Sequence, residues 1–187
     1  MRTASNPPAK LTYRDFLEFP DDGKRHELID GGHYVTPSPV SRHQRILGNL
    51  FFLVRSHLEL HHGGDVYLSP LDVVFTIFDI VEPDLIFISN ARSGILTHEN
   101  VQGSPDLVVE ILSPSTRRRD EGVKLALYDR SDVLEYWVVD PFAHLIRIYL
   151  RQHARLARTA ELTRDRDEAL TTSLLPGMSL PLVKVFA

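Results

Sequence analysis

Residues 105–114, PDLVVEILSP, decide the fold of this chain. They predict a buried β-strand, because a short run rich in Val, Leu and Ile is bounded by proline at both ends. Glu110 lies in the middle of this run, where an unpaired carboxylate is costly. We therefore expect Glu110 to be paired with a cation, protonated, or bound to a metal ion.

Residues 82–88, EPDLIFI, repeat this arrangement upstream, so that Asp84 opens a second apolar strand. Side chains alternate along strands, and both carboxylates can reach one cation if the two strands are neighbours. Hard carboxylate oxygens suit Mg²⁺ or Mn²⁺. Taken alone, Asp84 is better explained as a strand-end aspartate in a turn. Glu110 in mid-strand favours a metal site over an ion pair with arginine.

The length and amino-acid composition of the chain are those of an ordinary globular protein. The chain has 187 residues, 43% of them hydrophobic and 25% charged, which suits one domain with an ample core. The absence of cysteine excludes disulfides and thiolate sites and fits a cytoplasmic protein. We see neither a signal peptide nor a run long enough to span a membrane, and expect no membrane association. The net charge of −4 counts mildly against DNA as a partner, although acidic metal ligands contribute to that sum.

The hydrophobic patterns predict a mixed α/β domain at residues 11–187, preceded by a flexible tail at residues 1–10. We expect helices at 13–19, 41–62 and 120–130, a hairpin at 25–36 turning at Gly31-Gly32, and strands at 71–77, 84–89, 106–112, 135–140 and 145–150. Thr12 and Asp120 are the expected N-caps of the first and third helices. Residues 90–104 are expected to form a loop, and the last stretch is weakly patterned apart from a turn at Pro176-Gly177.

Two further polar residues could join the carboxylates. Lys124 borders the stripe that Val123 and Leu127 form on the helix after the Glu110 strand, so it could orient a water or stabilise a phosphate. From the sequence alone, a surface lysine is the more common arrangement. Glu27 lies beside the hairpin turn, where a solvated glutamate is the simplest interpretation.

The remaining candidates are weaker. His43, near the start of the long helix, could face a site, although a lone histidine is usually structural. The histidines at 57, 61 and 62 have no zinc spacing and are expected to be solvated. The basic run 117–119 could contact a phosphate backbone or be a solvated charge run. The serines at 113 and 115 are explained by the turn.

Several runs of the sequence, taken together, resemble a known family. They are HELIDG at 26–31, Ser38-Pro39 followed by His43, EPDL at 82–85, PDLVVEILSPST at 105–116, Asp120 with Lys124 and Tyr128, and EYWVVDP at 135–141. This succession resembles a widespread bacterial family of predicted restriction endonucleases within the PD-(D/E)XK nuclease superfamily. The resemblance covers about residues 11–186, and the runs at 105–116 and 135–141 are its most specific parts.

The resemblance implies a restriction-endonuclease-like core, with a mixed central sheet flanked by helices, and Mg²⁺-dependent cleavage of phosphodiester bonds. Asp84 matches the motif aspartate, Glu110 the motif acid, and Glu27 the upstream glutamate of the family. The motif lysine should follow Glu110 by two residues, but Leu112 stands there. Lys124, in the following helix, matches the relocated lysine.

We therefore expect a nuclease that hydrolyses DNA with Mg²⁺ or Mn²⁺. Asp84 and Glu110 would bind the metal, Glu27 would assist directly or through water, and Lys124 would position the water or the transition state. Double-strand cutting would call for a homodimer. The alternative is a catalytically inactive nuclease-fold module that binds nucleic acid or a protein partner. Net acidity favours this alternative slightly, while the retention of all four polar residues favours the enzyme.

Overall fold

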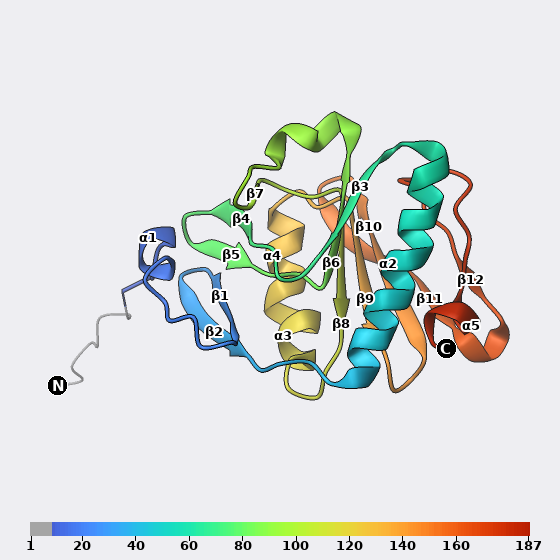
Figure 1. The fold of residues 1–187 in the computed structure, drawn as a ribbon, viewed down its shortest axis with the longest axis horizontal. Coiled ribbons are helices and arrows are strands. Elements are labelled where there is room, and N and C mark those ends of the chain that lie inside the picture. The colour runs from blue at the N-terminus through green and yellow to red at the C-terminus, as the bar shows by residue number, and fades with distance from the viewer. Residues whose placement is uncertain (1–8) are drawn as a thin grey trace.

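A six-stranded mixed sheet forms the centre of the computed structural model, which describes residues 9–187 (Figure 1). Most of the tail expected at residues 1–10 therefore lies outside the described residues. In spatial order the strands are β11 (Arg155–Thr163), β10 (Leu145–Gln152), β9 (Glu135–Asp140), β8 (Leu107–Ile111), β6 (Leu85–Ser89) and β3 (Gly64–Leu68). Only β8 and β9 run parallel; the other four neighbouring pairs in this sheet are antiparallel.

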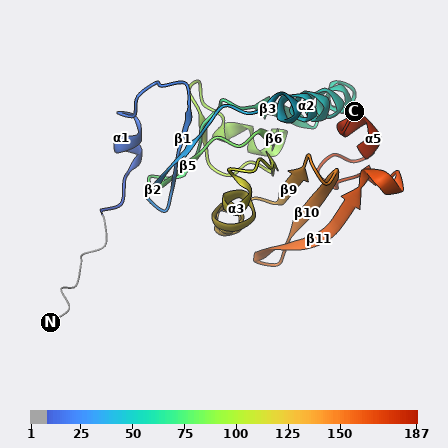
Figure 2. The same ribbon diagram turned by 90° about the horizontal axis from the view of Figure 1, so that it is seen from below.

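Helices cover both faces of this sheet, as expected for the fold class. The long helix α2 (Ser41–His61) packs one face together with the C-terminal segment, through residues such as Leu50, Phe87 and Trp137 (Figure 2). The opposite face, which carries Val108 and Tyr136, packs against the helical segment that follows β8. Because side chains alternate along each strand, odd and even positions of β8 enter different cores.

A second sheet of five strands lies beside the first, in the order β2-β1-β5-β4-β7. Its strands are β1 (Arg25–Ile29), β2 (Gly32–Thr36), β4 (Val73–Thr76), β5 (Asp79–Val81) and β7 (Val101–Gln102). The hairpin of β1 and β2 turns at Asp30 and Gly31, whose φ angles are 52° and 73°, and not at Gly31-Gly32. Positive φ at both turn positions matches the twist of the flanking strands. This hairpin places Glu27 toward the first sheet.

The helical segment after β8 begins earlier than its sequence predicts. It comprises α3 (Arg117–Arg119), one π-helical turn at Asp120–Lys124 and α4 (Leu125–Arg130). Asp120 is therefore not an N-cap but lies inside the helix, 1% exposed. Val123 is 41% exposed, so the expected stripe is wrong at that position, and Lys124 takes the buried place instead. Single π turns widen a helix locally and recur at functional sites.

The other elements are short or lie at the periphery. They are α1 (Tyr13–Phe16), a 3₁₀ turn at Asn90–Ile95 within the expected loop, a second at Arg164–Arg166, β12 (Ala169–Leu170), β13 (Leu180–Pro181) and α5 (Leu182–Val185). Thr12 caps α1 in a capping box with Asp15, and this helix ends sooner than the expected residue 19. Within residues 9–187, no helix is long and apolar enough to cross a membrane.

Candidate active site

Asp84 immediately precedes β6, and Glu110 lies on the neighbouring antiparallel strand β8, on the same face of the sheet. The register pairs Leu85 with Val109, which places Asp84 and Glu110 opposite each other one position further along. The Ile111 backbone N–H donates a hydrogen bond of 2.8 Å to Asp84 Oδ2. Both carboxyl groups are buried, 2% and 3% exposed, and both line one pocket.

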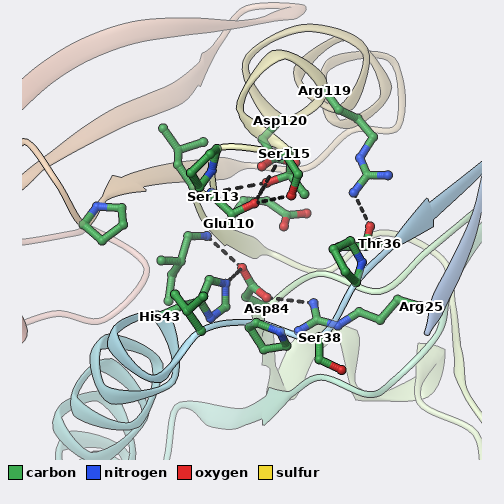
Figure 3. A pocket seen from close by; sticks show the side chains of 18 of the residues that line it. Arg25, Thr36, Ser38, His43, Asp84, Glu110, Ser113, Ser115, Arg119 and Asp120 are labelled. Carbon is green, nitrogen blue, oxygen red and sulfur yellow. Dashed lines mark hydrogen bonds and ion pairs between the residues drawn. The ribbon is translucent and has the colours of Figure 1, made fainter. Parts of the chain in front are cut away.

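The side chains of one arginine and one histidine from distant elements contact Asp84 (Figure 3). Arg25, from β1, donates to Oδ1 at 2.8 Å, and His43, from the first turn of α2, contacts Oδ2 through Nε2 at 3.0 Å. Burial alone would raise the pKa of Asp84, but the contacts with His43 and Arg25 outweigh it and lower the pKa to about 2. Asp84 is therefore a carboxylate throughout the neutral range. The sequence drew attention to His43 only weakly and to Arg25 not at all.

Lys124 links two further carboxylates across three elements. Its Nζ lies 2.7 Å from Glu110 Oε1 and 2.8 Å from Glu27 Oε1. Lys124 is 2% exposed and Glu27 1% exposed, so the interpretations as a surface lysine and a solvated glutamate are both wrong. Tyr128, one turn along the helix, donates its hydroxyl to Glu110 Oε1 at 2.6 Å. The four residues expected from the sequence are thus brought together at one place.

The electrostatics of this cluster keep the lysine charged. Burial alone would lower the pKa of Lys124, but the surrounding Glu110, Glu27 and Asp120 outweigh burial and raise it. The pKa of Glu110 is raised to about 8, mainly by burial and further by nearby acids, against the lowering effect of Lys124. A charged ammonium is a donor and cannot serve as a general base.

Several oxygen atoms of the cluster remain available to a ligand. Glu27 Oε2 and Asp120 Oδ1 are buried without a hydrogen bond, and Arg119 Nη2 lies 3.5 Å from Glu27 Oε2. The hydrogen bonds from Lys124 and Tyr128 both fall on Oε1 of Glu110. In the part of the chain that the structure describes, no group of three or more His, Cys, Asp or Glu is arranged to hold a metal ion. The donors are hard oxygens that suit Mg²⁺ or Mn²⁺ chemically, but they are not a preformed cage.

The cluster forms the floor of a pocket of about 220 Å³. Its walls come from the β2–α2 connection, the loop after β8 and the β9–β10 turn; the lining residues outside the cluster include 36–40, 111–116, Pro141 and Phe142. The basic run contributes to this wall unevenly. Arg117 pairs with Asp140 at 2.7 Å, Arg119 hydrogen bonds to Thr36, and Arg118 is exposed.

The turn serines and the histidines at the end of α2 take no part in the carboxylate cluster. Ser113 Oγ lies 3.0 Å from Ser115 Oγ and 2.9 Å from Thr116 Oγ1, within the turn that follows β8. His57 and His61 stack on each other at the far end of α2, with ring centroids 4.0 Å apart. The serines thus belong to the turn, as expected. His61 and His62 are exposed, as expected for a solvated helix end, whereas His57 is half-buried.

Comparison with known proteins identifies relatives along nearly the whole chain. The model of the Uma2 family, described as "Putative restriction endonuclease", matches residues 13–183. An uncharacterised protein of Synechocystis, slr1290, is 30% identical over 139 residues, which cover 72% of this chain and 70% of that protein. A crystal structure of a "putative nuclease belonging to DUF820" from Anabaena variabilis superposes with a TM-score of 0.79 at 19% identity, covering 94% of this chain and 97% of that one. The structural likeness confirms the expected mixed α/β nuclease fold.

Proposed function

The chain belongs to the Uma2 family, and on that premise we propose that it is a nuclease that hydrolyses DNA phosphodiester bonds with Mg²⁺ or Mn²⁺. One observation carries the proposal: Lys124 lies within 2.8 Å of both Glu110 and Glu27, at the floor of a pocket that Asp84 also lines. A buried set of ion pairs contributes little to folding that a well-packed apolar set of the same volume could not. The arrangement supports a catalytic role for Lys124. It would take the place of the motif lysine, which is absent because Leu112 stands at the motif position.

Asp84 and Glu110 would hold the ion, with Glu27 assisting directly or through water. When bound, the ion would polarise the phosphate and acidify a water molecule. Arg25 and His43 keep Asp84 ionised and fix its orientation through contacts of 2.8 Å and 3.0 Å. Metal binding would use Glu110 Oε2, which accepts no hydrogen bond from Lys124 or Tyr128. Burial favours the protonated form of Glu110, and metal binding would release that proton.

Lys124 remains an ammonium, and its role follows from its charge. A fixed donor next to the phosphate stabilises the negative charge that builds up as the attacking oxygen adds. Because the lysine is held by two carboxylates on β1 and β8, it needs no reorganisation when that charge develops. Tyr128 supports this geometry by holding Glu110 Oε1 from the same helix, at 2.6 Å.

Cleavage assays test the proposal directly. Supercoiled plasmid and labelled oligonucleotides are incubated with Mg²⁺, with Mn²⁺ and with a chelator, using wild type, Glu110→Gln and the exposed control Glu99→Gln. We expect metal-dependent cleavage that falls at least about a hundredfold in Glu110→Gln, because losing a metal ligand removes several kcal/mol of transition-state stabilisation. Glu99→Gln should cut at the wild-type rate. Equal cleavage by wild type and Glu110→Gln would reveal a contaminating nuclease and refute the assignment.

The structure also gives an argument for the alternative, a nuclease-fold module without catalytic activity. Asp84 is held by Arg25 and His43, and Glu110 by Lys124, so side chains of the protein already occupy the carboxylates. A metal would have to compete with these pairs. Wild-type protein that binds metal yet cleaves neither DNA nor RNA would favour this module.

A further inference from the structure

A large aromatic ring stands exposed on a firmly held turn at the wall of the pocket. Phe142, in the β9–β10 turn, is 63% exposed. The backbone N–H groups of Phe142 and Ala143 each donate to Asp140 Oδ1 at 3.0 Å, and Arg117 donates to Asp140 Oδ2 at 2.7 Å. The backbone that carries the ring is therefore fixed, while most of the ring itself is left to solvent.

The same turn is tied to the start of α2. Arg42 Nε donates to the Pro141 carbonyl at 3.2 Å, and its Nη2 lies 2.9 Å from His144 Nε2. Val40, 61% exposed, lines the pocket together with Phe142. Four prolines complete this apolar lining: Pro37, Pro39, Pro114 and Pro141. The pocket thus combines a charged floor with an exposed, rigid, apolar wall.

The floor is too deeply placed for a stacked double helix. Asp84, Glu110 and Lys124 are only 2–3% exposed, at the bottom of a pocket of about 220 Å³. Enzymes that do chemistry on a base act on single strands or flip the nucleotide out of the duplex, because a stacked duplex cannot enter their pockets. The same geometric argument applies to the recessed floor of this pocket. Proteins that hold a duplex through its phosphates are usually basic, whereas this chain has a net charge of −4. Recognition through bases suits such a surface better than recognition through phosphates.

We propose that the pocket takes an unpaired DNA strand, in which one base stacks on Phe142 while a neighbouring phosphate reaches Asp84 and Glu110. The inference rests on the proposed function, because it assumes that these carboxylates are where the strand is cut. Aromatic stacking tolerates any base, so the preference is for unpaired structure and not for a sequence. One pocket suffices for each cut, so cleavage of a single strand requires no second copy of the chain.

Binding and cleavage are measured with a short single-stranded oligonucleotide and with the blunt duplex that contains it. Binding is followed by fluorescence anisotropy in chelator, so that it is read independently of activity. We expect the single strand to bind more tightly and to be cut faster. Phe142→Ala should weaken single-strand binding about fivefold to a hundredfold, the usual effect of losing one stacked base, and Phe142→Trp should restore it. Phe52→Ala, which removes a ring 68% exposed on α2 and outside the pocket lining, should change nothing.

A series of oligonucleotides that each lack one base separates stacking from a structural effect. The abasic position that faces Phe142 should weaken binding to wild type but not weaken binding to Phe142→Ala further, because both changes remove the same contact. Equal affinity of wild type and Phe142→Ala for the single strand would overturn the inference. Equal cleavage of the single strand and the duplex would also overturn it, but would leave the nuclease assignment standing. Binding that depends on Phe142 without cleavage of any DNA would support strand recognition and refute the proposed activity.

Discussion

Replacing Lys124 by methionine tests the buried cluster without depending on activity. The change keeps an unbranched side chain but removes the ammonium that lies 2.7 Å from Glu110 and 2.8 Å from Glu27. Breaking a buried ion pair by removing one partner costs about 3–5 kcal/mol, because a buried charge is left uncompensated. Since whole domains are stable by only about 5–15 kcal/mol, we expect a large drop in the free energy of unfolding.

The pH dependence of this loss has a definite sign. Lys124 lowers the pKa of Glu110 and of Asp120 against the effect of burial, so its removal raises both pKa values further. The folded variant then holds protons that the folded wild type releases. Stability that comes from such protons is present at low pH and is lost as pH rises. The deficit of Lys124→Met should therefore be smaller near about pH 6 and grow toward about pH 9, because the folded wild type releases the Glu110 proton near pH 8.

The assay is thermal and urea unfolding followed by circular dichroism at the two pH values, with Lys184→Met as the control. Lys184 is exposed on α5, and its replacement should change the free energy of unfolding by less than about 0.5 kcal/mol. For a chain of this length, 3–5 kcal/mol corresponds to a fall in melting temperature of about 6–20 °C. If Lys124→Met loses no more stability than Lys184→Met, or loses it equally at both pH values, the reasoning about the cluster is refuted.

Two further predictions concern the stability of the wild type and of variants in α2. Burial raises the pKa of Glu110 to about 8 and that of Glu82 to about 7. In metal-free buffer the melting temperature of the wild type should therefore fall as pH rises from about 5 to about 8. The melting temperature of Glu110→Gln should fall less over the same range. A melting temperature that is flat over this range in wild type would contradict it. Leu50→Ala, in the fully buried stripe of α2, should lower the free energy of unfolding by about 2–5 kcal/mol, whereas Phe52→Ala on the exposed side of the same helix should lower it by less than about 0.5 kcal/mol, measured by urea titration. Equal losses would mean that α2 does not pack as described.

The sequence predicts those parts of the fold and site that depend on local pattern. The alternation of side chains indicates which residues share a face with each carboxylate along its own strand, and the pairing of β6 with β8 then places Asp84 and Glu110 on one face. The apolar stripe of α2 is long and regular, and its observed bounds, Ser41–His61, differ from the expected 41–62 by one residue. Both features are properties of neighbouring residues along the chain, which is why no knowledge of the tertiary structure is needed to find them.

The parts that the sequence does not predict arise from contacts between distant segments. Glu27 and Lys124 carry charged side chains of a kind that is usually exposed, and their burial is created only when the hairpin and the π-helical turn meet over β8. The strand β11 escapes prediction for another reason. It is an edge strand whose exposed arginines and glutamate, such as Arg155, Arg158 and Glu161, mask the alternating pattern. Charged edges of this kind prevent pairing with other chains.

The central claim, that Asp84 and Glu110 hold a divalent ion, is tested most directly by anomalous scattering from crystals soaked in Mn²⁺. The account predicts an anomalous peak within coordination distance of both carboxylates, about 2.0–2.2 Å, and its loss in Glu110→Gln crystals of the same form. The control is a soak in chelator, which should remove the peak. Crystals that take up Mn²⁺ elsewhere, while Lys124 and Arg25 keep their pairs with Glu110 and Asp84, would contradict the account.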